Sequence, residues 1–270
     1  MNMRFVYPDG KRKALTFSYD DGQIFDKRLA ELLRSHGMKG TFHLNSGKLD
    51  IQSEKGKYVA PEEVAEVYAG HEVACHGVKH LNLPLVMPRQ VIPELEEDRR
   101  ALEKLTGGMV QGLSYAFGAY NDRVKNIARL LGFKYSRTVQ DTGYFNPPED
   151  FMQWHPTCHH NNNLLALGEQ FLDVPGFYEL PLMYVWGHSY EFDLSDDWSV
   201  IEAFVEKMAY KDDIWYATNI EICNYVEAVR RQEFSTDGTR MYNPTSLSVW
   251  SSTAEGVVEV KPGQYFDFLN

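Results

Sequence analysis

The feature that most constrains the fold of this chain is the regular alternation of short strand patterns with amphipathic helix patterns. Residues 14–19 (ALTFSY) are rich in β-forming side chains and predict a strand, and residues 24–36 place their large apolar side chains on one face of a helix. Further strands are predicted at 41–44, 72–75, 113–117, 133–139, 179–187 and 214–218. Further helices are predicted at 61–70, 89–105, 122–131, 163–172, 196–209 and 220–231.

Strands that alternate with helices predict a parallel sheet. Six or seven such units in about 235 residues favour an α/β fold, a distorted (β/α) barrel with about seven parallel strands, and an open doubly wound sheet is the alternative. The segment 239–268 differs, because it has turn residues such as Pro244 and Gly263 and no helical period. We therefore expect a barrel over residues 1–235 and a small C-terminal antiparallel β extension over residues 236–270 that packs on it.

Composition argues against several classes of protein. The chain has 270 residues and a formal net charge of −11 without an extended basic patch, which argues against nucleic-acid binding. It has no run of about 18 apolar residues, so no membrane-spanning helix is predicted. The three cysteines are too widely spaced for a disulfide framework, and the first residues contain no signal-peptide pattern. A cytoplasmic protein is therefore expected, unless the chain is a trimmed form of a secreted one.

Polar residues follow three of the predicted strands, at the strand ends where parallel barrels carry their active sites. Asp20 and Asp21 come directly after the first strand, His76 follows the strand at 72–75, and His188 follows the strand at 179–187. By the same rule, Arg137 is of interest because it lies within the predicted strand 133–139. His80 lies four residues after His76, so a helical turn would place both imidazoles on one face. Two histidines and one carboxylate form a typical site for a divalent metal, with positions left for water and substrate. The second carboxylate could then act as a general base.

Four segments together resemble the motifs of the NodB-like polysaccharide deacetylases, carbohydrate esterase family 4. Residues 16–22 (TFSYDDG) are similar to the first motif, and residues 76–80 (HGVKH) match the H-x-x-x-H second motif. Residues 115–118 (YAFG) resemble a degenerate third motif, and residues 186–189 (WGHS) stand where the family has its last catalytic histidine. The four segments also follow one another in the family's usual order.

The resemblance implies a distorted (β/α) barrel, a hydrolase that removes acetyl groups, and a role for each motif residue. Asp21, His76 and His80 would bind one divalent metal ion, usually zinc, with cobalt, nickel and manganese as alternatives. Asp20 would be the base that activates the attacking water. His188 would be the acid that protonates the leaving group.

The resemblance also assigns the backbone N–H of Phe117 to the oxyanion. Two departures from the family pattern matter. The third motif lacks the arginine that orients the base, and Arg137 in the next predicted strand could replace it, with a structural salt bridge as the alternative. The fourth motif, an aspartate and a tryptophan that support the acid, has no clear match. Candidates for that support are Asp141, Trp154, Tyr190 and Glu191.

Three further histidines are interpreted as lying outside the metal site. His71 precedes a predicted strand, and a structural hydrogen-bonding role is preferred for it. His159 and His160 have no adjacent carboxylate, so a structural or substrate-rim role is preferred over a second metal site.

The sequence thus predicts a metal-dependent deacetylase that acts on an acetylated carbohydrate, with the N-acetyl groups of an amino-sugar glycan as the expected target. The alternatives are an O-acetyl esterase or a small-amide hydrolase on the same scaffold, and a non-catalytic carbohydrate-binding relative. The intact set of Asp20, Asp21, His76, His80 and His188 argues for an enzyme, because a binding module needs no such set.

Overall fold

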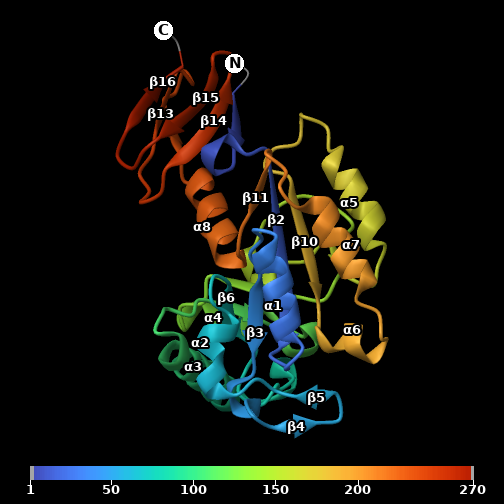
Figure 1. Cartoon of the computed structure of the whole chain (residues 1–270). Coiled ribbons are helices and arrows are strands. Elements are labelled where there is room, and N and C mark those ends of the chain that lie inside the picture. The colour runs from blue at the N-terminus through green and yellow to red at the C-terminus, as the bar shows by residue number, and fades with distance from the viewer. Residues whose placement is uncertain (1–2, 269–270) are drawn as a thin grey trace.

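The computed structural model describes residues 3–268, and its centre is a barrel of parallel strands surrounded by helices (Figure 1). The barrel strands are β2 (Lys13–Asp21), β3 (Thr41–Leu44), β6 (Glu72–Cys75), β7 (Gly112–Ser114), β8 (Tyr135–Arg137), β9 (Cys158–His159) and β10 (Leu182–Gly187). They pair in the order β8-β7-β6-β3-β2-β10-β9, and every pair is parallel. A parallel bridge between Arg137 and Trp154, just before β9, links the two ends of this order. The prediction of a distorted barrel of about seven parallel strands is confirmed.

The central strand β2 carries the first motif to one end of the barrel. All of its residues are buried. Along one edge β2 pairs with β10, and along the other it pairs first with β11 (Ile214–Tyr216) and then with β3. Its last residues, Asp20 and Asp21, therefore lie beside His43 and Leu44 at the end of β3. The carboxyl ends of these strands form the floor of the candidate site.

The interior of the barrel is polar along β2. Alternate residues of this strand pack in the apolar core beneath the helices, and the residues between them face inward. Thr16 Oγ1 donates to the side chain of Asn219 at 2.8 Å, and Ser18 Oγ lies 3.2 Å from Nδ1 of His43. These inward polar groups satisfy one another and end at Asp20, so the barrel interior leads directly to the candidate site.

Helices cover the outside of the barrel and follow the predicted order. They are α1 (Asp26–Ser35), α2 (Val64–Val67), α3 (Pro88–Thr106), α4 (Asp122–Leu130), α5 (Leu164–Leu172), α6 (Tyr190–Leu194), α7 (Ser199–Met208) and α8 (Asn219–Arg230). Short 3₁₀ turns are η1 (Pro8–Gly10), η2 (Ser46–Lys48), η3 (Pro61–Glu63), η4 (Leu83–Leu85), η5 (Ala116–Gly118) and η6 (Phe151–Gln153). The predicted elements do not include α6, which directly follows His188. Within residues 3–268, no helix has the length and apolar character needed to cross a membrane.

Two small antiparallel sheets lie beyond the end of the barrel opposite the candidate site (Figure 1). One contains β12 (Glu233–Phe234), β13 (Arg240–Tyr242) and β16 (Tyr265–Asp267), and the other contains β1 (Arg4–Val6), β14 (Val249–Thr253) and β15 (Gly256–Val260). The hydroxyl of Tyr225 in α8 accepts from the N–H of Trp250 at 3.1 Å and donates to the carbonyl of Val6. The C-terminal segment is therefore antiparallel β structure, as expected. One of its two sheets also contains β1, a strand from the start of the chain, which pairs with β14. A short hairpin of β4 (Gln52–Ser53) and β5 (Gly56–Lys57) lies at the other end.

Candidate metal centre and active site

A left-handed turn at the end of β2 directs two adjacent carboxylates to one place. Neighbouring residues of a strand normally point to opposite sides. Here Asp21 has a φ of +80° and Gly22 a φ of +82°. As a result, Asp20 Oδ2 and Asp21 Oδ1 lie 3.7 Å and 3.9 Å from Nε2 of the same imidazole, His76. A left-handed aspartate is uncommon, and such strained backbone is concentrated at functional sites.

The segment from His76 to His80 is a loop, and the helical turn expected from the spacing of four residues is wrong. Gly77 has a φ of +85° and His80 a φ of +61°, values that no helical turn contains. The two imidazole rings nevertheless meet, with centroids 4.6 Å apart. The loop, rather than a helix face, brings the two histidines together.

Two carboxylates of α3 hold this loop in place. Asp98 accepts hydrogen bonds from the backbone N–H groups of Ser46, His76 and Gly77, at 2.8, 3.1 and 2.9 Å. Glu94, one helical turn earlier, accepts from two N–H groups later in the loop, at 2.7 and 3.3 Å. A Cβ at Gly77 would lie 2.7 Å from Glu94, so glycine is required there. In a helical turn these backbone N–H groups would bond to carbonyls of the same segment. Here they donate to the carboxylates of α3 instead, which explains the loop conformation.

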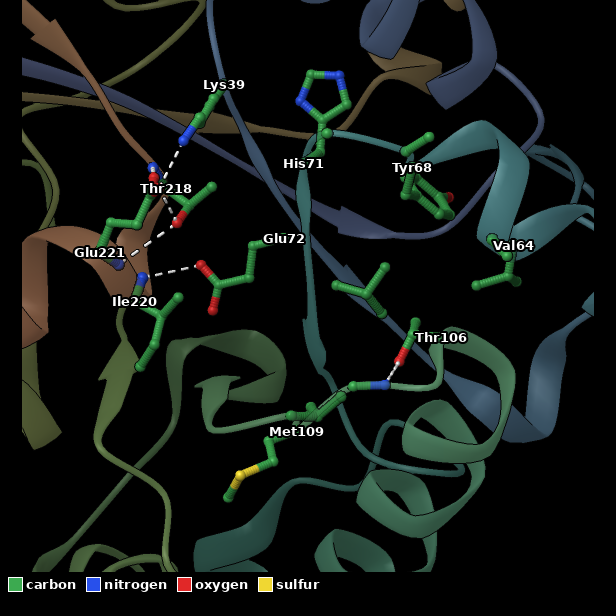
Figure 2. Close-up of a pocket in the computed structure, with 16 residues that line it drawn as sticks. Lys39, Val64, Tyr68, His71, Glu72, Thr106, Met109, Thr218, Ile220 and Glu221 are labelled. Atoms are coloured by element: carbon green, nitrogen blue, oxygen red, sulfur yellow. Dashed lines mark hydrogen bonds and ion pairs between the residues drawn. The ribbon is translucent and has the colours of Figure 1, made fainter.

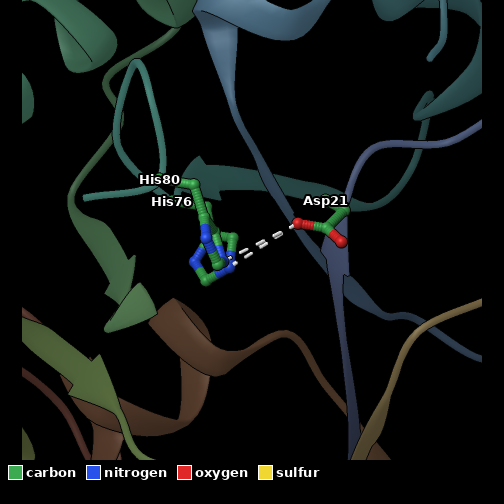
Figure 3. A group of neighbouring side chains, drawn as sticks. All are labelled: Asp21, His76 and His80. Atoms are coloured by element: carbon green, nitrogen blue, oxygen red, sulfur yellow. Dashed lines mark ion pairs between the residues drawn. The ribbon is translucent and has the colours of Figure 1, made fainter. Parts of the chain in front are cut away.

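Asp21, His76 and His80 together fit a divalent metal (Figure 3). Asp21 Oδ1 lies 3.9 Å from Nε2 of each histidine, which is too long for a hydrogen bond, and this buried oxygen has no hydrogen-bond partner among the described residues. Nδ1 of His76 donates to the carbonyl of Ser114 at 2.9 Å, which leaves the lone pair of Nε2 free. Burial and the neighbouring His76 lower the pKa of His80 to about 4, so the His80 imidazole is neutral.

The donor set of one carboxylate oxygen and two imidazole nitrogens is one that zinc prefers. The three donor atoms lie within 4.8 Å of one another, so one ion could contact all of them after a small adjustment of the side chains. Of the predicted ligands, all three are therefore brought together. The orphaned oxygen of Asp21 is the observation that distinguishes this site from an ordinary hydrogen-bonded cluster.

Asp20 is held by two side chains from neighbouring strands. The Arg137 guanidinium contacts Asp20 Oδ2, and the hydroxyl of Ser114 donates to Oδ1 at 3.1 Å. Arg137 is fully buried, donates through Nε to Ser18 at 3.1 Å, and stacks on the Trp186 ring at 4.5 Å. Burial alone would raise the pKa of Asp20, but Arg137 and the nearby histidines hold it well below its usual range. Asp20 is therefore ionised, with the Arg137 guanidinium as its cationic partner.

The Arg137→Ala protein is expected to lose about 10²-fold in kcat, because the base is no longer held in one rotamer. The Arg137→Lys protein should recover only part of this loss, since a point charge does not reproduce the fork of the guanidinium. Metal content by elemental analysis should stay at the wild-type level in both. An Arg137→Ala protein that folds and turns over at the wild-type rate would show that Arg137 is only a structural ion pair.

His43 also contacts Asp20, and sequence reasoning did not identify it. Its Nδ1 lies 3.5 Å from Asp20 Oδ1, and its ring is fully buried. Burial lowers the pKa of His43 to about 3, so the imidazole is neutral. The only signal in the sequence is a histidine within the strand pattern at 41–44. Its contact with Asp20 follows from the strand register, which pairs His43 of β3 with Asp20 of β2.

His188 lies between β10 and α6, next to Glu191. Its Nδ1 is 3.4 Å from Glu191 Oε1. Burial lowers the pKa of His188, but Glu191 and Asp20 outweigh burial, and the net shift is upward. Of the four candidates for supporting the acid, Glu191 is the carboxylate that contacts His188, and the Tyr190 ring lies 5.0 Å away.

The other two candidates lie elsewhere. Asp141 accepts from Nε1 of Trp186 at 2.7 Å, and Trp154 is buried among Tyr135, Phe151 and Tyr184. Neither makes a described contact with His188. Trp154 is a core residue, because it packs within a cluster of buried apolar side chains.

Phe117 lies at the mouth of the site. Its side chain is 63% exposed, and its ring centroid is 4.5 Å from that of His80. Its φ of +61° is the third left-handed value of a non-glycine residue in this site, after those of Asp21 and His80. The third motif thus places a strained, exposed residue directly beside a predicted metal ligand.

A separate pocket of about 460 Å³ lies near the opposite ends of the strands (Figure 2). Its lining includes Lys39, which precedes β3, and Glu72, the first residue of β6, and none of the predicted site residues line it. His71 at its edge accepts from the N–H of Gly40 at 3.0 Å and contacts the carbonyl of Ala30 at 2.9 Å. These bonds support the structural interpretation of His71.

Comparisons with known proteins identify a family with a similar sequence and solved structures with a similar fold. A family model described as "Polysaccharide deacetylase" matches residues 7–136, which contain the first three motifs. The crystal structure of a "putative polysaccharide deacetylase" from Mycobacterium smegmatis has a TM-score of 0.63 and 18% identity, over 84% of this chain and 94% of that one. The crystal structure of Puue allantoinase has a TM-score of 0.61 and 13% identity, over 80% of this chain and 91% of that one.

One curated sequence, "NAD(P)H-quinone oxidoreductase subunit M, chloroplastic" from Populus jackii, is 25% identical over 199 residues, which are 71% of this chain and 88% of that protein. Identity at this level assigns no activity to the chain. The two solved structures, at lower identity still, establish the barrel fold. The matching family model covers the motifs that form the metal centre. The resemblance to the polysaccharide deacetylase family is therefore confirmed over residues 7–136.

Proposed function

We propose that this protein is a metal-dependent hydrolase that removes acetyl groups from a carbohydrate, with the N-acetyl groups of an amino-sugar glycan as the preferred target. The observation that carries the proposal is the contact between ionised Asp20 and Arg137 directly beside the donor set of Asp21, His76 and His80. The match of residues 7–136 to the polysaccharide deacetylase family model supports the acetyl group as the group that is removed.

Asp21, His76 and His80 would hold one divalent ion. Zinc suits two imidazoles and a carboxylate best, and cobalt, nickel and manganese are the alternatives. When bound, the ion supplies positive charge that polarises the acetyl carbonyl and makes water more acidic. The remaining chemistry belongs to side chains of the chain itself.

Asp20 and His188 divide the proton transfers. Asp20 is ionised and held by Arg137, so it can take the proton from the attacking water. The pKa of His188 is raised, so its protonated form persists to higher pH and can donate a proton to the leaving nitrogen. The two residues thus offer an ionised base and a protonated acid at the same pH. The backbone N–H of Phe117 would stabilise the carbonyl oxygen as it gains negative charge.

A screen for acetate release tests the proposal. The zinc- or cobalt-loaded protein is incubated with N-acetylated amino-sugar oligomers, O-acetylated glycans and small cyclic amides, with the Asp20→Asn protein as the control. Acetate release from the N-acetylated oligomers, absent from the control, is the expected result. Preferential release from the O-acetylated glycans would indicate an esterase, and ring opening without acetate would indicate a small-amide hydrolase. No hydrolysis of any of these by the metal-loaded protein would contradict the proposed activity.

A further inference from the structure

A cluster of three histidines around one carboxylate includes the proposed acid, His188. His159 and His160 stand at the end of β9, and Nε2 of each lies 3.1 Å from Oε2 of Glu191. The other oxygen, Oε1, lies 3.4 Å from Nδ1 of His188. Sequence analysis found no carboxylate adjacent to His159 and His160, because Glu191 comes from α6, far along the chain.

The ring tautomers distinguish this cluster from the metal centre. At His76, Nδ1 donates to a carbonyl, so Nε2 presents a lone pair. At His159, Nδ1 accepts from the backbone N–H of Asn161 at 3.2 Å, so Nε2 carries the proton, and it lies 3.1 Å from Oε2 of Glu191. An imidazole binds a metal through an unprotonated nitrogen. His159 therefore contacts the carboxylate through a protonated nitrogen, an arrangement that does not suit a metal ligand.

His160 is fixed in place by packing. It is 1% exposed, its ring stacks on Tyr19 with an interplanar angle of 12°, and its centroid lies 4.1 Å from that of Phe192. A Cβ at Gly187 would lie 2.1 Å from Nδ1 of His160, so the ring rests directly on the backbone that precedes His188. Neither of its nitrogens has a hydrogen-bond partner among the described residues, and its Nε2 lies 3.1 Å from Oε2 of Glu191. A buried imidazole without other partners is thus aimed at Glu191.

We propose that His159 and His160 are positioning residues for the acid: they hold Oε2 of Glu191, so that Oε1 stays against Nδ1 of His188 and Nε2 of His188 remains free for the substrate. The inference rests on the proposed role of His188 in the deacetylation. It assigns a function to a histidine pair that lies outside the four motif segments.

The charge states of Glu191 and His188 are consistent with this positioning role. Burial raises the pKa of Glu191, but the three imidazoles lower it well below its usual range, so the carboxylate is ionised. The groups that face His188 are Glu191 and Tyr190 from α6, Asp20 and Asp21 from β2, and His159 from β9. Among them Glu191 has the largest upward effect on the pKa of His188. Loss of the His188–Glu191 contact would therefore make His188 a stronger acid that deprotonates at lower pH.

The test compares His159→Phe, His160→Phe, Glu191→Gln and the double variant His160→Phe/Glu191→Gln with the wild type, all loaded with zinc. At position 160 phenylalanine keeps the stacking on Tyr19, and at both positions it removes the ring nitrogens. His36→Phe, a histidine at the end of α1 that does not contact Glu191, is the matched control. The pKa of His188 is measured by NMR, its signal assigned with a His188→Gln protein, and kcat and KM are measured on the substrate that the acetate screen identifies.

In the Glu191→Gln protein the pKa of His188 should fall by about 1–3 units, the usual effect of losing an adjacent opposite charge. The His159→Phe and His160→Phe proteins should show a smaller fall in the same direction, with kcat reduced about 10-fold and KM nearly unchanged. The double variant should resemble Glu191→Gln alone, because the histidine acts only through the carboxylate. The His36→Phe control should match the wild type.

Two results would overturn the inference. The first is a His188 pKa and kcat that are unchanged in both phenylalanine variants. The second is a metal content of about two ions per chain in the wild type that falls to one in Glu191→Gln, which would make the cluster a second metal site. The NMR measurement needs no turnover, so it tests the positioning role even if the wild type releases no acetate.

Discussion

The Asp20→Asn protein is expected to bind its metal at the wild-type level and to lose about 10²–10⁴-fold in kcat. Asparagine is nearly the same size and accepts the hydrogen bond from Ser114, but its amide cannot take a proton from water. The metal ligands are Asp21, His76 and His80, so none of them is removed. Turnover should be followed as acetate release at saturating substrate, with metal content measured on the same sample.

Stability provides the control for this variant. Asp20→Asn leaves the buried Arg137 without its carboxylate partner, and breaking a buried ion pair typically costs about 3–5 kcal/mol. Kinetics should therefore be measured well below the unfolding temperature of the variant. If metal is lost together with activity, Asp20 and Asp21 have exchanged roles. If kcat stays within a few-fold of the wild type, Asp20 is not the base.

Much of the site could be predicted because a parallel barrel gathers the carboxyl ends of its strands at one end. Asp20, Asp21, His76 and His188 all follow strands that the hydrophobic pattern identifies. Their places at the strand ends were enough to expect that their side chains lie close together. The same rule directed attention to Arg137, the last residue of β8. Its contact with Asp20 follows from the closeness of β8 and β2 across the barrel interior.

The residues that sequence reasoning missed act through tertiary contacts without a local pattern. Asp98 looks like one more acid in a charged helix, yet it is buried and binds loop amides. Glu191 lies in α6, a helix too short for its periodicity to be recognised. The left-handed turn at Asp21 is likewise invisible, because an aspartate before a glycine is compatible with several turns. Each of these features depends on which elements pack together, and one sequence does not specify that packing.

The His80→Ala protein is expected to lose its metal and, with it, detectable turnover. Only three protein ligands are available, so removing one should eliminate most of the affinity. His80 is the least buried of the three, with a side chain 18% exposed against 2% for His76, so its truncation disturbs the core least. The fold should therefore persist, since Asp98 and Glu94 still hold the loop.

Thermal unfolding with and without a chelator separates metal loss from misfolding. A ligand that binds only the folded state stabilises it, by about 4 kcal/mol at a thousand times its Kd. Zinc should therefore raise the Tm of the wild type, and a chelator should lower it again. In His80→Ala neither should change the Tm, and the value should lie near that of the chelated wild type. The His36→Ala protein, altered at a histidine outside the site, should respond to zinc as the wild type does. Full zinc occupancy in His80→Ala, measured by elemental analysis after dialysis, would remove His80 from the ligand set and leave the orphaned oxygen of Asp21 without an explanation.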